Sequence, residues 1–173
     1  MRQETHQKLE KLRNEVGREY GKLVQKLLAV TCLDTDALKL VERSTQGIDL
    51  EMEIAGERCV FEVKTSESDA VRLTPKDIEG LDRLVEDGAR VYLAVLTNGP
   101  FEDWILARYL PGEFPTGKNL SSFPFRAHRD RELEHRILST FDRVVDQYVH
   151  IAITRRQGGM DQVLQRYAAW GRA

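Results

Sequence analysis

Residues 47–64, GIDLEMEIAGERCVFEVK, contain the pattern that decides the fold. Apolar side chains alternate with acidic ones up to Ile54, which predicts a half-buried strand. Residues 55–57 then form a short turn, and residues 58–64 return as the second strand of a hairpin. The two strands therefore run antiparallel, with one apolar face toward the core.

Three charged side chains emerge on the other face of this hairpin. Alternate residues of a strand share a face, so Glu62 and Lys64 point together, away from the apolar side chains beside them. Asp49 stands at the start of the antiparallel partner strand, so it lies on the same face and at the same end as Glu62. When each residue is considered alone, a solvated cross-strand ion pair is the competing interpretation.

Such a trio can supply what the hydrolysis of a phosphodiester requires. Mg²⁺ is bound by a few carboxylate oxygens and keeps sites for water and a substrate phosphate. The metal polarises the phosphoryl oxygen and lowers the pKa of a bound water. A lysine nearby can orient or deprotonate that water and offset developing negative charge. The hairpin therefore predicts a Mg²⁺ or Mn²⁺ site on Asp49 and Glu62, with Lys64 beside the attacking water.

The rest of the chain alternates between helical and strand patterns. Residues 5–29 carry apolar side chains at helical spacing. Thr74-Pro75 suits a helix start, and Asp77 completes a capping-box-like spacing there. The expected elements are a helix at 5–29, a strand at 37–42, the hairpin, a helix at 74–88, a strand at 90–96, an edge strand at 104–110, a loop at 111–127, a helix at 130–153 and, after Gly158-Gly159, a short helix at 161–170. This order predicts an α/β fold, with a mixed central sheet flanked by helices and a C-terminal helical extension.

The composition fits one compact unit. The chain has 173 residues, 41% of them hydrophobic, which is enough to build a core. We expect a core at residues 1–110, and a loop and C-terminal helices at 111–173. An apolar stripe in nearly heptad steps, from Leu133 to Ile151, either covers the sheet or pairs two subunits, so a homodimer is one of two interpretations.

The same composition excludes several classes of protein. No apolar stretch approaches the length that crosses a bilayer, so no membrane partner is expected. Cys32 and Cys59 have no metal-type spacing, and two cysteines do not suggest a secreted disulfide scaffold. These features favour a cytoplasmic protein.

Charge is unevenly distributed along the chain. Residues 1–103 carry 15 basic and 21 acidic side chains, whereas residues 104–173 carry 11 basic and 7 acidic ones. A net charge of −2 is awkward for a nucleic-acid protein, but the basic second half could meet phosphates. Weak candidates for DNA contacts are Arg126, Arg129 and Arg131, where an ordinary charged helix start is the competing interpretation, and Gln46 near the hairpin.

Asp49, followed at a separation of 13 by Glu62-Val63-Lys64, resembles the PD-(D/E)XK nuclease superfamily, which includes restriction endonucleases and archaeal Holliday-junction resolvases. The order of elements over residues 12–97 is similar too. The resemblance implies a restriction endonuclease-like fold and a metal-dependent DNA endonuclease that acts on duplex or branched DNA and leaves a 5′-phosphate. It also implies that the Val63 carbonyl joins Asp49 and Glu62 as a metal ligand. No proline precedes Asp49, a departure that many members share.

In the resolvase-like branch, a glutamate of the first helix often joins the site. Glu15 and Glu19 are the candidates here. On one continuous helix, Glu19 lies nearer the apolar stripe, where a carboxylate is costly unless it has a partner. We therefore favour Glu19 as a further catalytic and metal-binding residue; an edge residue whose carboxylate reaches solvent is the competing interpretation.

Two alternatives stay open. The first is a catalytically inactive nucleic-acid-binding or protein-interaction module on the same fold. The overall acidity slightly favours it, whereas the intact Asp49, Glu62 and Lys64 argue against it. The second is that the resemblance is accidental and the chain is an α/β domain of another function.

Overall fold

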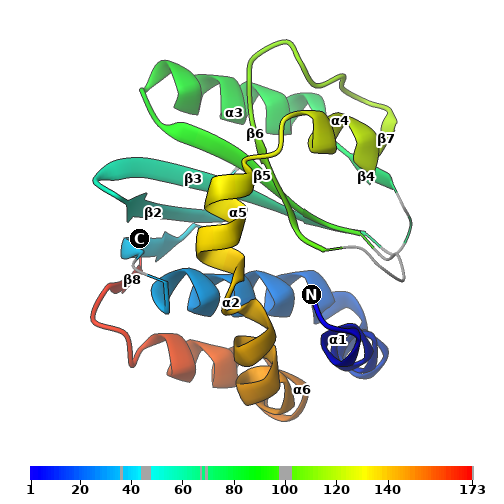
Figure 1. The fold of residues 1–173 in the computed structure, drawn as a ribbon, viewed down its shortest axis with the longest axis vertical. Coiled ribbons are helices and arrows are strands. Elements are labelled where there is room, and N and C mark those ends of the chain that lie inside the picture. The colour runs from blue at the N-terminus through cyan, green and yellow to red at the C-terminus, as the bar shows by residue number, and fades with distance from the viewer. Residues whose placement is uncertain (36, 44–47, 67, 69, 98–102, 173) are drawn as a thin grey trace.

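A six-stranded mixed sheet forms the centre of the molecule (Figure 1). The computed structural model describes residues 1–173 except 36, 44–47, 67, 69, 98–102 and 173. The strands of the central sheet are β1 (Leu38–Glu42), β2 (Leu50–Ile54), β3 (Glu57–Thr65), β5 (Arg90–Leu96), β6 (Ile105–Arg108) and β8 (Trp170–Arg172). They lie in the order β6-β5-β3-β2-β1-β8. The β3–β5 and β1–β8 pairs are parallel and the others antiparallel, so the sheet is mixed.

The predicted hairpin is formed by β2 and β3. Its register pairs Leu50 with Phe61 and Ile54 with Glu57. The two turn residues, Ala55 and Gly56, have φ angles of 54° and 80°. Two successive residues with positive φ give the tight turn whose twist matches that of the flanking strands. The alternation of buried and half-buried residues along β2 follows the pattern expected from the sequence.

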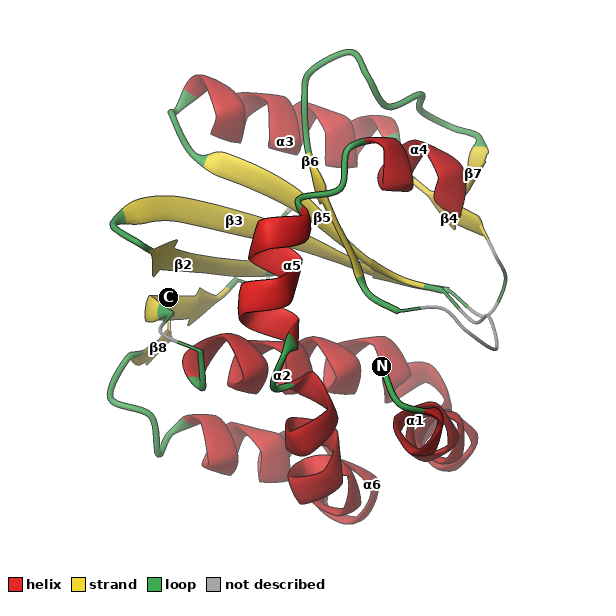
Figure 2. Ribbon diagram, viewed as in Figure 1, coloured by secondary structure: helices red, strands yellow, loops and turns green. Residues whose placement is uncertain are grey.

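Helices cover both faces of the sheet (Figure 2). The larger core packs one face against α1 (Gln3–Val16), α2 (Tyr20–Leu33), α5 (Arg131–Leu138) and α6 (Phe141–Leu164). The other face packs against α3 (Pro75–Glu86) and a small unit made of β4 (Ala70–Arg72), β7 (Asn119–Ser121) and α4 (Ser122–Ala127). The mixed α/β architecture expected from the sequence is confirmed.

The single helix expected at residues 5–29 is wrong in one respect, because it consists of two helices. Gly17 has φ 55° and ψ −121°, which ends α1. A 3₁₀ turn at Gly17–Glu19 then leads into α2. Positive φ is readily available to glycine, so Gly17 is a natural place for the break.

The expected loop at residues 111–127 is also corrected. Its second half contains β7, which pairs with β4, and α4. Leu120 and Phe125 are buried in the core on the α3 face. Strand pairing between segments about fifty residues apart leaves no local signal in the sequence. The prolines and glycines of this segment are local signals, and they indicate a loop.

The C-terminal elements differ from expectation at three points. The helix expected at 130–153 is two helices, α5 and α6. The Gly158-Gly159 pair does not separate α6 from a later helix; the local break lies at Arg156, with φ 55° and ψ −151°, and helical turns resume as far as Leu164. Trp170 belongs to β8, which adds to the sheet beside β1 instead of ending a helix.

Buried side chains of α6 belong to the same core as α1 and α2. Of the near-heptad stripe, Phe141 and Val144 are buried in this core, and Tyr148 and Ile151 are partly buried against it. Cys32 and Cys59 are free thiols buried in that core. Among the residues that the structure describes, no helix has the length and apolar character needed to cross a membrane.

The break in α6 provides a test of this packing. A methyl group added at Gly159 would lie 2.4 Å from Arg155 Cβ and 2.9 Å from Ile151 Cγ2. We expect Gly159→Ala to lower the free energy of unfolding by about 1–3 kcal/mol, because the contact forces the backbone to shift. At Gly158 the same methyl meets nothing within 4 Å. Urea unfolding should therefore show Gly158→Ala unchanged or stabilised by up to about 1 kcal/mol; equal losses in both variants would contradict this account.

Candidate metal centre

Asp49 and Glu62 lie near each other at the open end of the hairpin, close enough for the charge of one to act on the other. The regular register of the hairpin ends at the Leu50–Phe61 pair, and Asp49 directly precedes β2. The backbone N–H of Asp49 donates to the carbonyl of Phe61 at 3.1 Å, whereas a regular ladder would join Asp49 to Glu62, so the pairing is irregular at this point. Alternation along β3 turns Glu62 and Lys64 toward the α3 face of the sheet. These two side chains share a face, as expected from the sequence, and a common face with Asp49 stays a prediction.

The Asp49 carboxylate is held by two donors. Oδ2 accepts a hydrogen bond from the Val63 backbone N–H at 2.9 Å. Oδ1 accepts one from Lys22 Nζ of α2 at 3.1 Å. The first bond fixes the side chain against β3, and the second brings a cation from the opposite face of the sheet. Lys22 was not among the residues expected at the site.

Lys64 is held between two carboxylates. Its Nζ lies 2.7 Å from Glu62 Oε1 and 3.2 Å from Asp77 Oδ2. The same Asp77 oxygen accepts the Thr74 backbone N–H at 2.8 Å, in a reciprocal capping box at the start of α3. The helix cap therefore also positions the ammonium group of Lys64.

Burial and charge shift the pKa values of these groups in different directions. Burial raises the pKa of Glu62, which is 6% exposed; nearby Asp49 adds to the effect and Lys64 opposes it. Burial disfavours the charged form of Lys64, but Glu62 and Asp77 outweigh it and raise the pKa of the ammonium group. Burial would raise the pKa of Asp77, but the Thr74 N–H and the Lys64 charge lower it instead. Lys64 is therefore firmly cationic.

Sequence reasoning identified Asp77 only as a helix cap. Part of the signal for the contact of Asp77 with Lys64 was present in the sequence. A helix that follows a strand after a short connection begins near the end of that strand, and α3 begins ten residues after β3 ends. What the sequence could not supply was the direction of α3, which brings its first turn back over Lys64. Lys22 was missed because a solvent-facing lysine on a helix is usually unremarkable.

Glu19 and Glu15 lie toward α6. Glu19 Oε2 accepts a hydrogen bond from Gln157 at 3.2 Å, and the backbone carbonyl of Glu15 accepts one from Arg156. The break at Gly17 changes the phase of the helix, so the continuous wheel that favoured Glu19 does not apply. Gly21 of α2 approaches β3, since a methyl added there would lie 3.2 Å from Thr65 Oγ1. The role of Glu19 at the site stays a prediction.

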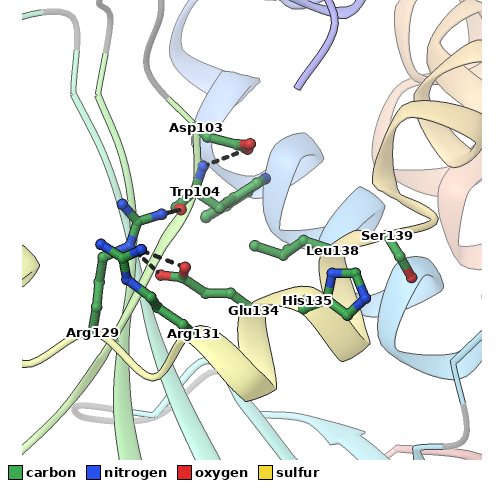
Figure 3. Close-up of a pocket in the computed structure, with 8 residues that line it drawn as sticks. All are labelled: Asp103, Trp104, Arg129, Arg131, Glu134, His135, Leu138 and Ser139. Atoms are coloured by element: carbon green, nitrogen blue, oxygen red, sulfur yellow. Dashed lines mark hydrogen bonds and ion pairs between the residues drawn. The ribbon is translucent and has the colours of Figure 1, made fainter.

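The candidate DNA contacts fall in separate places. Gln46 lies outside the described residues. Arg126 is on α4, whereas Arg129 and Arg131 line a pocket of about 340 Å³ beside α5 (Figure 3). Arg129 is engaged there, since its Nε lies 2.8 Å from Oε1 of the buried Glu134. Arg131 is exposed at the rim. These three arginines therefore do not form one cluster, and their contact with DNA remains a prediction.

The side chains at the open end of the hairpin fit a hard divalent cation. The described part of the chain contains no cluster of three or more His, Cys, Asp and Glu side chains with metal-binding geometry. Asp49 and Glu62 offer carboxylate oxygens alone, which suits Mg²⁺ or Mn²⁺ because Mg²⁺ keeps several water ligands. A buried carboxylate such as Glu62 also gains from a neighbouring cation. Whether the Val63 carbonyl completes the set is a prediction.

Comparison with known proteins supports the fold. No protein-family model matches the sequence, and no curated protein does. Among solved structures, Hjc of Archaeoglobus fulgidus, a Holliday junction resolvase from an archaeal hyperthermophile, is similar with a TM-score of 0.52 and 17% sequence identity. The similarity covers 67% of this chain and 96% of the resolvase chain. The central sheet and its flanking helices thus form a restriction endonuclease-like fold.

The double role of Asp77 predicts a pH-dependent contribution to stability. Its pKa is lowered in the folded protein, so its stabilisation is complete above the ordinary aspartate value and is lost as the pH falls through the lower folded value. We expect Asp77→Ala to lower the free energy of unfolding by about 1 kcal/mol at pH 7. The difference from wild type should shrink below about pH 4.

Urea unfolding at pH 7 and pH 3 measures this difference. Glu79→Ala is the matched control, since Glu79 is an exposed carboxylate on the same helix, 65% exposed and paired with Arg83. It should change stability little at either pH. A loss in Asp77→Ala that is equal at both pH values would contradict an ionic contribution.

Proposed function

We propose that this protein is a metal-dependent DNA endonuclease of the PD-(D/E)XK type. The observation that carries the proposal is the arrangement of Asp49 and Glu62 at one end of the β2–β3 hairpin, with Lys64 held 2.7 Å from Glu62. The restriction endonuclease-like fold supports it, because the two carboxylates and the lysine lie on the central hairpin of that fold.

Each residue has a distinct role in this proposal. Asp49 and Glu62, with the Val63 carbonyl, would hold Mg²⁺ or Mn²⁺. When bound, the metal polarises the scissile phosphate and lowers the pKa of a water molecule. Lys64 holds the attacking water by donating a hydrogen bond from its ammonium group and offsets negative charge on the phosphate. Asp77 and Glu62 restrict the rotation of Lys64, so that its charge is already oriented when substrate binds.

The proposed substrate is DNA, duplex or branched. The similar archaeal protein is a Holliday junction resolvase, which favours branched DNA among the possibilities. A homodimer is proposed as well, because nucleases that cut both strands are often dimers. The apolar stripe of α6 is largely buried within one chain, so a dimer would use other surfaces.

One observation favours a second function, that of a non-cutting nucleic-acid or protein-interaction module. Both carboxylates already have lysine partners: Lys22 at Asp49 and Lys64 at Glu62. Each carboxylate proposed to hold the metal therefore has a cationic partner without it. If these ion pairs are the working state of the protein, the carboxylates are structural and no divalent cation binds.

Cleavage assays test the nuclease proposal directly. Purified protein with Mg²⁺ or Mn²⁺ should cleave at least one of duplex, single-stranded and branched DNA. Asp49→Ala and Lys64→Ala should each reduce the rate by about 100-fold or more, since each removes a group that acts at the reacting phosphate. The readout is the rate of product formation on a denaturing gel.

Glu51→Ala is the matched control for these variants. Glu51 lies on β2, two residues after Asp49. Its carboxylate pairs with Arg58 and Arg43 and not with Lys64. Its replacement should leave the rate within about 2-fold of wild type. Cleavage by Lys64→Ala at the wild-type rate, or no cleavage of any substrate by wild type, would contradict the proposal.

Calorimetric titration with Mn²⁺ separates the two candidate functions. Under the nuclease proposal the wild type binds the metal, and Lys22→Met binds it up to about 5-fold more tightly, because an exposed ion pair competes with about 1 kcal/mol or less. Lys39→Met, which removes the exposed Lys39–Glu53 pair, should bind like wild type. No binding heat in any of the three proteins would support the non-cutting module.

A further inference from the structure

One aromatic side chain is presented to solvent at the site end of the molecule. Phe123 is 76% exposed, whereas Phe125, two residues later on the same short helix, is fully buried. A scattered exposed apolar residue is normal on a protein surface and by itself means nothing. The position, support and neighbours of Phe123 decide whether it has a function.

Phe123 lies close to the catalytic strand through the β4–β7 pair. Ser121 of β7 pairs with Ala70 of β4. Ala70 follows Lys64 by six residues, so their Cα atoms are at most about 20 Å apart. Figure 1 shows β4, β7 and α4 grouped on the side of the molecule toward which β3 and β5 run. The Ala70–Ser121 pair and the two residues from Ser121 to Phe123 add about 12 Å, so the Cα atoms of Phe123 and Lys64 are at most about 35 Å apart.

The helix that carries Phe123 is firmly supported. Phe125 packs in the core against Phe114, with ring centroids 5.7 Å apart and an interplanar angle of 26°. Phe114 in turn stacks on Tyr109 at 5.7 Å. Because this aromatic column anchors one face of α4, the opposite face is held outward. Phe123 is thus a preorganised surface group, and a ligand that covers it loses little conformational entropy in the protein.

A guanidinium group accompanies the exposed ring. Arg126 follows Phe123 by three residues, a spacing that places two side chains on the same side of a helix. The Nε of Arg126 donates a hydrogen bond to Ser122 Oγ at 3.3 Å, which holds the guanidinium group close to the helix. An aromatic face beside a cation is the chemistry that recognises a nucleotide, since the ring stacks on the base and the cation meets the phosphate.

We propose that Phe123 and Arg126 form a stacking platform for one unpaired nucleobase of the DNA substrate. Both faces of a base inside a duplex are covered by its neighbours, so only a base that has left the stack can use the ring. The enzyme therefore prefers DNA with unpaired nucleotides within about ten positions of the cleaved bond. This inference rests on the proposed nuclease function and specifies its substrate.

Binding measured without cleavage tests the platform. Fluorescence anisotropy with a labelled single-stranded oligonucleotide is recorded in EDTA, so that no strand is cut. Phe123→Ala should bind about 5- to 100-fold more weakly than wild type, the range that corresponds to one stacked base. Phe123→Tyr keeps an aromatic face and should bind like wild type. Affinity for a fully paired duplex should be the same in all three proteins.

Leu110→Ala is the matched control, because Leu110 is also a large exposed apolar residue, 44% exposed, but follows β6 and is not part of α4. It should leave binding to the single strand unchanged. Wild-type affinity in Phe123→Ala, an equal loss on duplex and single strand, or no single-strand binding by wild type would each overturn the platform. The cleavage rate of Asp49→Ala is measured separately, so loss of the nuclease proposal and loss of the platform give different results.

Discussion

The pairing of Leu50 with Phe61 fixes both faces of the central hairpin at once. With this register, the side chains that enter the core shared with α1, α2 and α6 are Leu50, Met52, Ile54, Cys59 and Phe61, and Asp49 lies near Glu62 at the open end. Because side chains alternate along a strand, a slip by one residue would turn these core residues to the other face and separate the carboxylates. The fold and the site therefore depend on the same constraint.

Period-two alternation made this part of the molecule predictable from the sequence. The hairpin, the buried β5 and the capping box of α3 each depend on residues close together in the chain, and each is present. The β4–β7 pair and the addition of β8 beside β1 depend on contacts between distant segments. Such contacts leave little local signal, so they were missed.

The residues of the candidate site also divide into those that local sequence predicts and those that depend on contacts between distant segments. Asp49, Glu62 and Lys64 share a hairpin, and their common face follows from strand geometry alone. Lys22 and Asp77 reach the site from α2 and α3, so their positions depend on how helices pack on the sheet. These two residues set the charge around the site. Local sequence thus predicted the groups proposed for the chemistry, and tertiary packing determined which groups balance them.

The outer edge of β6 is already occupied by the chain itself. The backbone of residues 128–130 bonds to it, with Arg108 N–H donating to the His128 carbonyl at 2.8 Å and Asp130 N–H to the Leu106 carbonyl at 2.9 Å. A second protein chain could extend the sheet here only after displacing this segment, and at the opposite edge β8 offers a strand of three residues. Exposed strand edges are templates for aggregation and for sheet-to-sheet assembly. Among the described strands, the β6 edge of the central sheet is therefore closed to a second chain, and association at this edge has to use side chains.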